Sequence, residues 1–172
     1  MLETPEELDR LQHMLDASMA AAGPHLSGII TAERRLDARQ LTERLHGMRL
    51  LVLATVTADG RPLAGPVDGY FVHGTFWFSS GRESVRMRHV AARPAVSATH
   101  LPGEELAVTV HGRAEIFPMD DPVSAELRQA MLDEYLPKQG PAFEEWLNDS
   151  DAVAARIEPE KMFTFHMAAA GH

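Results

Sequence analysis

The sequence contains no cysteine, which excludes a disulfide framework, a thiolate metal site and a cysteine nucleophile. No apolar run approaches the roughly 20 residues that a transmembrane helix needs, so we expect no interaction with a membrane. The first residues are acidic and are not followed by an apolar core, so we also expect no secretory signal. These absences predict a cytoplasmic protein.

Several well-known catalytic and nucleotide-binding motifs are missing too. The chain has no Gly-x-Ser-x-Gly nucleophile elbow, no Walker loop and no Rossmann glycine fingerprint. Its nine histidines show no His-x-x-x-His pair or other ligand spacing, so we expect no dedicated metal site. A serine hydrolase is likewise not expected, and no residue of the sequence is assigned a catalytic role.

The length of 172 residues and an apolar content of 45% are typical of one globular domain. Within that domain we expect N-terminal helices over 1–48 and a barrel core over 49–118. A helical insertion over 119–150 and a last strand with a tail over 151–172 are expected to follow.

Capping signals predict two helices in the N-terminal part. Thr4 precedes Pro5 and has Glu7 three residues later, which is the pattern of a capping box. Asp37 and Gln40 repeat this spacing, and apolar residues follow both boxes at helical intervals. Both helices are predicted to serve packing.

The middle of the chain has the pattern of short strands. Residues 50–56 are apolar on both faces, which is typical of a strand covered on both sides. Asp59-Gly60 predicts a two-residue hairpin turn, and Pro62 and Pro66 predict that the returning strand is an edge, bent or interrupted. Further strands are predicted over residues 76–78, 95–100, 106–117 and 162–166. The glycine within 106–117 predicts a bulge. About six strands with peripheral helices predict a mainly β fold, a small and mostly antiparallel β-barrel.

The net charge of −9 is unevenly distributed along the chain. Residues 1–59 carry nine acids and six bases, and residues 101–172 carry fourteen acids and five bases. Residues 60–100 carry five arginines against two acids. We expect no nucleic-acid partner, because affinity for a phosphate backbone needs many basic residues together. The basic segment suits one small anion.

A serine-rich loop over residues 79–84 and the helix predicted after it form the most informative segment. Ser84 is a good N-cap, and the N–H groups of a helix start favour an anion. Ser79 and Ser80 add hydroxyl donors, and Arg82 and Arg86 can make charge-assisted contacts to phosphate oxygens. The pattern predicts a site for a terminal phosphate monoester. Arginines that only solvate a helix face explain it about equally well.

Six short segments follow one another in a distinctive order. They are 53–56 (LATV), 59–62 (DGRP), 76–80 (FWFSS), 84–90 (SVRMRHV), 93–97 (RPAVS) and 112–116 (GRAEI). In this order and spacing the chain resembles the pyridoxamine 5′-phosphate oxidase-like split β-barrel group, which includes flavin- and deazaflavin-dependent oxidoreductases. The resemblance covers roughly residues 40–118 and the last strand.

The resemblance implies a homodimer that binds two FMN cofactors in clefts between its subunits. It places the phosphate contacts on Ser79, Ser80, Ser84 and Arg86, with a further polar residue, His89, one turn later. It places the flavin ring beside Gly65, Pro66, Val67 and Asp68, whose backbone groups would face the polar edges of the ring.

The chain also departs from true pyridoxamine 5′-phosphate oxidases. Those enzymes carry an arginine near the position of Gly65, a lysine near that of Tyr70, and a final segment rich in tryptophan and arginine, so vitamin B6 oxidation is not expected here. The hypothesis is an FMN-binding oxidoreductase that transfers hydride or electrons between a reduced nicotinamide and a small organic acceptor. One alternative is a deazaflavin-dependent reductase, whose longer acidic coenzyme would also suit Arg61, Arg82 and Arg88. Another is a non-catalytic carrier or sensor of flavin or, less expected, of haem.

Overall fold

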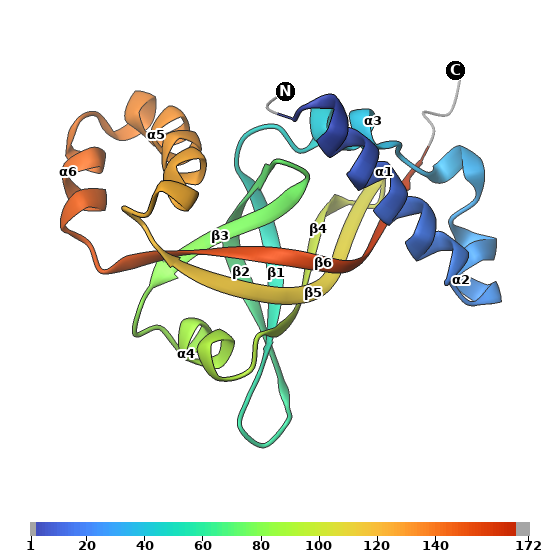
Figure 1. The fold of residues 1–172 in the computed structure, drawn as a ribbon, viewed down its shortest axis with the longest axis horizontal. Helices are drawn as coiled ribbons and strands as arrows, with labels where there is room; N and C mark the ends of the chain where they lie inside the picture. Colours follow the sequence, from blue (N-terminus) through green and yellow to red (C-terminus); the bar gives the residue numbers. More distant parts are fainter. Residues whose placement is uncertain (1–2, 168–172) are drawn as a thin grey trace.

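In the computed structural model, which describes residues 3–167, six antiparallel strands form one closed barrel (Figure 1). The strands are β1 (Arg49–Val56), β2 (Pro62–Val72), β3 (Thr75–Gly81), β4 (Ala95–Gly103), β5 (Leu106–Pro118) and β6 (Ala152–His166). Their order around the barrel is β1-β2-β3-β6-β5-β4. The predicted fold class, a mainly β barrel with peripheral helices, is confirmed. The predicted tail after the last strand, over 168–172, lies outside the described residues.

The helices surround the barrel. They are α1 (Pro5–Ala20), α2 (Pro24–Ile29), η1 (Ala32–Arg34), α3 (Ala38–Arg44), α4 (Val85–Ala92), η2 (Pro122–Ser124), α5 (Ala125–Gln139) and α6 (Ala142–Asp149). In Figure 1, α1 to α3 lie at one end of the barrel, α5 and α6 at the other, and α4 beneath it. Over residues 3–167, no helix is long and apolar enough to cross a membrane.

Both predicted capping boxes are present. Thr4 Oγ1 accepts a hydrogen bond from Glu7 N at 3.3 Å, and the Glu7 carboxylate accepts one from Thr4 N at 2.8 Å. Asp37 and Gln40 make the same reciprocal pair at the start of α3. Local spacing alone specifies these two helix starts, which is why they could be predicted.

Two apolar clusters hold the barrel and its helices together. Phe76 and Phe78 of β3 are fully buried inside the barrel. Trp77 lies between them in sequence and points to the other side of the strand, where it packs with Leu127 of α5 and Phe143 of α6. This alternation fastens the helical segment to the outside of β3.

β1 differs from its prediction, because within the described chain only one of its faces is covered. Leu51 and Leu53 are buried in the barrel, whereas Leu50 and Val52 are 57% and 52% exposed. Successive side chains of a strand point to opposite sides of the barrel wall, and the outward ones are open here. The turn after β1 is also longer than predicted. It spans residues 57–61, with Gly60 at a φ of +83°.

Two strand boundaries also differ from the predictions. Ser79 and Ser80, predicted as loop, belong to β3 because they pair with β6. β6 begins at Ala152, well before the predicted residue 162. The bulge at Gly112 is confirmed, since the register between β5 and β6 shifts there. A Cβ atom at Gly112 would lie 2.1 Å from the backbone oxygen of Glu158, so only glycine fits.

Candidate functional site

β2 and β3 pair over only part of their length, which leaves an opening in the barrel wall that we call the split. The two strands pair only where Gly69 to Val72 face Phe78 to Thr75. Residues 62–68 of β2 pair with β1 on one side, and residues 79–81 of β3 pair with β6 on one side. Within residues 3–167, each strand therefore leaves one edge without a strand partner. The prediction of an edge strand at the two prolines is confirmed for this half of β2.

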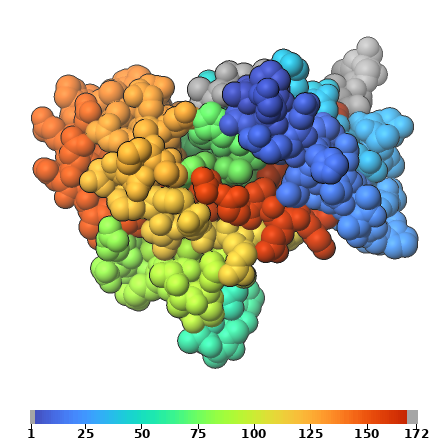
Figure 2. Space-filling view, in the orientation of Figure 1, coloured from blue at the N-terminus to red at the C-terminus, as the bar shows by residue number. Residues whose placement is uncertain are grey.

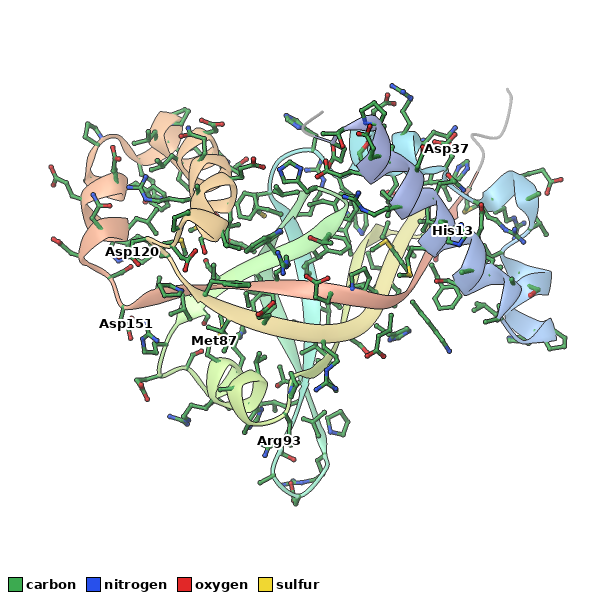
Figure 3. All side chains as sticks on the ribbon, viewed as in Figure 1. His13, Asp37, Met87, Arg93, Asp120 and Asp151 are labelled. Atoms are coloured by element: carbon green, nitrogen blue, oxygen red, sulfur yellow. The ribbon has the colours of Figure 1, made fainter. Side chains whose placement is uncertain are left out.

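The start of α4 lies at the end of β3, beside this split. Ser84 is the N-cap, and its Oγ accepts a hydrogen bond from Met87 N at 3.3 Å. Ser80 Oγ donates to Ser84 Oγ at 3.1 Å, and this bond joins the end of β3 to the start of α4. Met87, on the barrel side of α4, is buried and anchors the helix to the barrel (Figure 3). The predicted helix cap and the proximity of Ser80 and Ser84 are both observed.

Arg86 links α4 to the open edge of β2. Its Nη2 atom donates to the carbonyl oxygen of Pro66 at 2.9 Å. A Cβ atom placed on Gly65 would meet the same Nη2 atom at 3.8 Å. The guanidinium thus occupies the position that a neighbouring strand would take, and the bond to Pro66 uses one of its five N–H donors. The structure brings together Ser80, Ser84, Arg86, Gly65 and Pro66 from two separate segments.

Other predicted residues make their contacts elsewhere. His89 lies 3.0 Å, from Nδ1 to Oγ1, from the buried Thr55 of β1. Arg82 lines a hollow of about 230 Å³ together with Arg128 and Asp151. Val67 is buried in the barrel core, so its side chain is not available to a ligand.

Asp68 has a partner that the sequence did not predict. The hydroxyl of Tyr135, on α5, donates to its carboxylate at 2.5 Å. Burial, followed by this hydrogen bond and the charge of Asp68, raises the pKa of Tyr135 to about 12. The phenol therefore stays protonated at neutral pH. The bond ties the helical segment to the strand segment that was predicted to flank a flavin ring.

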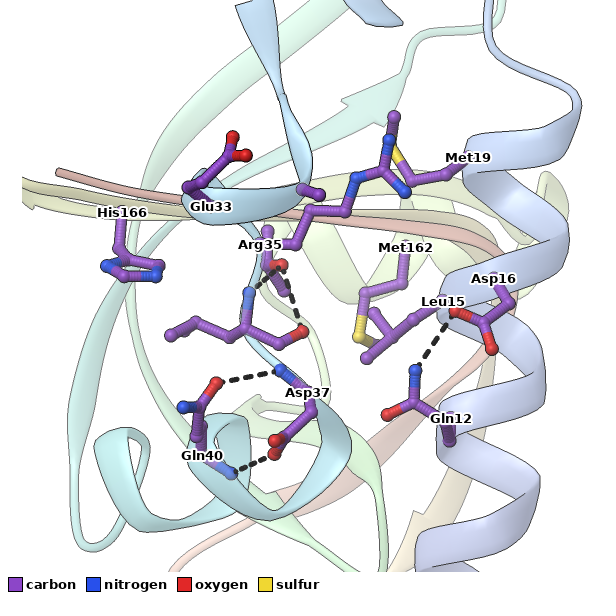
Figure 4. Close-up of a pocket in the computed structure, with 13 residues that line it drawn as sticks. Gln12, Leu15, Asp16, Met19, Glu33, Arg35, Asp37, Gln40, Met162 and His166 are labelled. Atoms are coloured by element: carbon purple, nitrogen blue, oxygen red, sulfur yellow. Dashed lines mark hydrogen bonds between the residues drawn. The ribbon is translucent and has the colours of Figure 1, made fainter. Parts of the chain in front are cut away.

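Most of the predicted cofactor residues are half-buried, and only Pro66, Asp68 and Arg82 are exposed. Arg82 is the predicted cofactor residue that lines one of the larger hollows among residues 3–167, whose volumes run from 230 to 490 Å³. A polar hollow of about 450 Å³ lies between α1, α3 and β6 (Figure 4). There Gln12 donates to Asp16, and Asp37 pairs with Gln40, so these polar groups satisfy one another.

An apolar surface adjoins the open edge of β2, and we call it the outer strand surface. It consists of Leu50 and Val52 on β1 and Leu101 on β4, which are 57%, 52% and 61% exposed. Val52 pairs with Pro66 on one side and with Thr99 of β4 on the other, so this surface begins directly beside the split. Such exposed apolar groups on adjacent strands are typical of a protein–protein interface. In Figure 2 the β1–β2 hairpin projects from the body of the molecule.

Comparison with known proteins places this geometry in context. A family model described as pyridoxamine 5′-phosphate oxidase matches residues 38–166, which is most of the chain. No curated protein sequence matches.

Solved structures share the fold. The haem storage protein HutZ from Vibrio cholerae is 18% identical with a TM-score of 0.61, over 77% of this chain and 95% of that one. An FAD-binding protein (mll6688) from Mesorhizobium loti is 24% identical with a TM-score of 0.54, over 78% and 98%. An F420 reductase is 24% identical with a TM-score of 0.52, over 69% and 91%.

Proposed function

The chain belongs to the pyridoxamine 5′-phosphate oxidase family, and on that premise we propose that it is an FMN-binding oxidoreductase. It transfers hydride or electrons between a reduced nicotinamide and a small organic acceptor. The observation that carries the proposal is the meeting of Ser84 and Arg86 beside the unpaired edge of β2. Hydroxyl and guanidinium donors at a helix start suit a phosphate monoester, and an open strand edge offers backbone groups to a flat polar ring.

The residues of the split fit FMN by the chemistry of their donors. Ser84 and Arg86 would hold the phosphate with donors that remain available, and Ser80 would join them by turning its hydroxyl from Ser84 to the phosphate. The backbone of residues 65–68, which has no strand partner on this edge, would lie along the ring, and Gly65 leaves room for close approach. FMN would supply the redox chemistry, while the chain positions the cofactor and tunes its environment. We assign no catalytic acid or base.

A second copy of the chain is part of the proposal. The outer strand surface exposes Leu50, Val52 and Leu101 beside the split, and a symmetric partner seated on it would enclose the cofactor. Val52→Asp places a charge in that contact. We expect it to convert a dimer to a monomer in analytical ultracentrifugation and to weaken FMN binding. A wild-type chain that sediments as a monomer with FMN bound would refute the role of the partner.

Vitamin B6 phosphates are not the expected substrates. By the resemblance, Gly65 and Tyr70 lie near the positions at which pyridoxamine 5′-phosphate oxidases carry an arginine and a lysine. A second phosphate beside the ring would therefore meet neither cation, and we propose a different small acceptor.

The cofactor is tested by its absorption spectrum. Purified chain is titrated in parallel with FMN, the deazaflavin coenzyme and haem, since flavin absorbs at longer wavelength than deazaflavin and haem shows a Soret band. The folds shared with F420 reductase and HutZ make the latter two the informative competitors. For haem, the axial ligands to test by substitution are His89 and His111, whose Nδ1 atoms bond to Thr55 and Ser97 and whose Nε2 atoms are not used in those bonds. Binding of none of the three would overturn the proposal.

Catalysis is tested separately from binding. The FMN-loaded chain is mixed rapidly with reduced nicotinamides under anaerobic conditions, and bleaching of the flavin band is followed. Turnover with added quinones or free flavins then completes the test. Tight FMN that nicotinamides do not reduce would favour a carrier or sensor over an oxidoreductase.

A further inference from the structure

Asp68 lies where the split ends and β2 begins to pair with β3. It is the last residue of the stretch of β2 that has no strand partner on this edge, since Gly69 already pairs with Phe78. Val67 is buried in the barrel, so the alternation of the strand directs the Asp68 side chain outward, where it is exposed. Leu50, opposite Asp68 on β1, belongs to the outer strand surface. Asp68 thus borders both the split and the surface on which we propose that a partner sits.

Tyr135 fixes the direction of the Asp68 carboxylate. It lies on α5, which packs on the outside of β3 through Leu127 and Trp77. The Tyr135 hydroxyl donates to Asp68 Oδ2, so one hydrogen bond joins the helical segment to the open edge of β2. An exposed aspartate on a strand edge is otherwise free to turn into water. The bond therefore holds the carboxylate at the end of the split.

The pair of Asp68 and Tyr135 keeps the full negative charge of the carboxylate. Burial, together with the hydrogen bond to Asp68, raises the pKa of Tyr135 to about 12, so the proton stays on the phenol. A phenol is a neutral donor and does not cancel the charge. Within residues 3–167, the Asp68 carboxylate forms no ion pair. The neighbouring acid on α5, Glu134, pairs with Lys138.

Two basic side chains near this part of β2 contact backbone groups instead. Arg49, opposite Gly69 on β1, donates to the carbonyl oxygens of Arg44 and Met48. Arg86 donates to the carbonyl oxygen of Pro66, two residues before Asp68. The split therefore has a cation beside the helix start and an uncompensated anion at its other end.

We propose that Asp68, oriented by Tyr135, lowers the reduction potential of FMN bound in the split. The inference rests on the proposed function, in which residues 65–68 lie along the flavin ring. Reduction adds electrons to the ring, and a fixed negative charge beside it opposes that gain. A partner seated on the outer strand surface would strengthen the effect, because it removes water that screens the carboxylate. The bound flavin then passes its electrons to an acceptor more readily.

The test compares the affinities of oxidised and reduced FMN. By thermodynamic linkage, the ratio of the two Kd values gives the shift in reduction potential that binding causes. Each form is titrated into the full chain by isothermal calorimetry under anaerobic conditions, the reduced form being prepared with dithionite. A spectroelectrochemical titration of the bound flavin measures the potential independently.

Asp68→Asn removes the charge and keeps an oxygen that accepts the hydrogen bond from Tyr135. Relative to the unaltered chain, we expect it to favour reduced over oxidised FMN by about tenfold and to raise the potential of the bound flavin. This is the size expected for one charge in an effective dielectric of about 20. Should this variant not fold, Asp68→Ser removes the same charge and takes its place.

Tyr135→Phe keeps the charge but removes the bond that orients it. The carboxylate can then turn into water, so the affinity ratio should shift in the same direction as in Asp68→Asn, and by less. A bond that only ties α5 to β2 would lower the Tm of both variants without moving the ratio. An unchanged ratio in Tyr135→Phe would refute the orienting role of Tyr135.

Asp133→Asn is the matched control. Asp133 lies on the same helix as Tyr135, is exposed, and accepts a hydrogen bond at 2.8 Å from the side chain of Gln129. The substitution removes an equal charge outside the split, so the affinity ratio should stay within about twofold of that of the unaltered chain.

Two results would overturn the role of Asp68. One is an Asp68→Asn variant whose affinity ratio and potential equal those of the unaltered chain. The other is an equally large shift in Asp133→Asn, which would assign the effect to the overall charge of the molecule. Either result leaves FMN binding intact and refutes this inference alone. A chain that binds neither form of FMN refutes the proposed function, and the inference is refuted with it.

Discussion

Removing the guanidinium of Arg86 should weaken FMN binding far more than it weakens the fold. A charge-assisted hydrogen bond to phosphate contributes about 1.5–3 kcal/mol. Arg86 is half-buried, so we take about 2 kcal/mol, which corresponds to a loss of about 30-fold in affinity. The measurement is the Kd of FMN for Arg86→Ala, from the quenching of flavin fluorescence.

The same substitution removes one structural bond. Loss of the hydrogen bond from Arg86 to the Pro66 carbonyl costs about 1 kcal/mol, a shift of about 2–4 °C in Tm for a chain of this size. Arg88→Ala is the matched control, because Arg88 lies on the exposed face of the same helix and its guanidinium donates to the backbone carbonyl of Glu83, just before the helix. Its FMN affinity should stay within about twofold of the unaltered chain, which a contact outside the site predicts. If Arg86→Ala folds and binds FMN as tightly as Arg88→Ala, Arg86 does not hold the phosphate.

Two further predictions concern stability. Gly112→Ala should lower the free energy of unfolding, measured in urea, by roughly several kcal/mol. The reason is that the added Cβ would collide with the Glu158 carbonyl. A change below about 0.5 kcal/mol would contradict this geometry. His73 should make stability fall as pH rises. Burial lowers the pKa of His73, but the hydrogen bond to Glu7 and the charges of Glu126 and Glu7 have the larger effect, so the pKa of His73 is raised. The ion pairs are then fully present below pH about 6.5 and lost as pH passes the raised pKa. The stability difference between the unaltered chain and His73→Gln should shrink over that interval, and a constant difference would exclude the effect.

Features specified by neighbours in sequence could be predicted from the sequence. The capping boxes at Thr4 and Asp37 and the N-cap at Ser84 each depend on a few adjacent residues. Their physics is local, so their spacing is sufficient to find them. The meeting of Ser84 with Arg86 at a helix start follows for the same reason.

Features that depend on tertiary structure could not be predicted in this way. Tyr135 reaches Asp68 across 67 positions, and no local pattern indicates such a contact. The bond from Arg86 to Pro66 likewise arises because β2 and β3 diverge. The apolar residues around Leu50 predict a strand covered on both sides, because an apolar pattern indicates that a side chain is buried but not what buries it.

The early part of β6 is not predicted by the sequence for a different reason. Small residues such as Ala154 and Ala155 carry little strand signal, and Pro159 interrupts the pattern. Pairing with β3 and β5 on both sides imposes the extended conformation there. Tertiary pairing thus outweighed weak local preference.

The open edge of β2 has a consequence for solubility. An extended segment with unsatisfied amide and carbonyl groups is a template on which another chain can add a strand. Pro62 and Pro66 remove two donors from that template, and the side chain of Arg86 caps one of its acceptors. The Arg86 guanidinium, which we propose binds phosphate, therefore also reduces self-association. Selection for ligand affinity and selection against aggregation then act on one side chain.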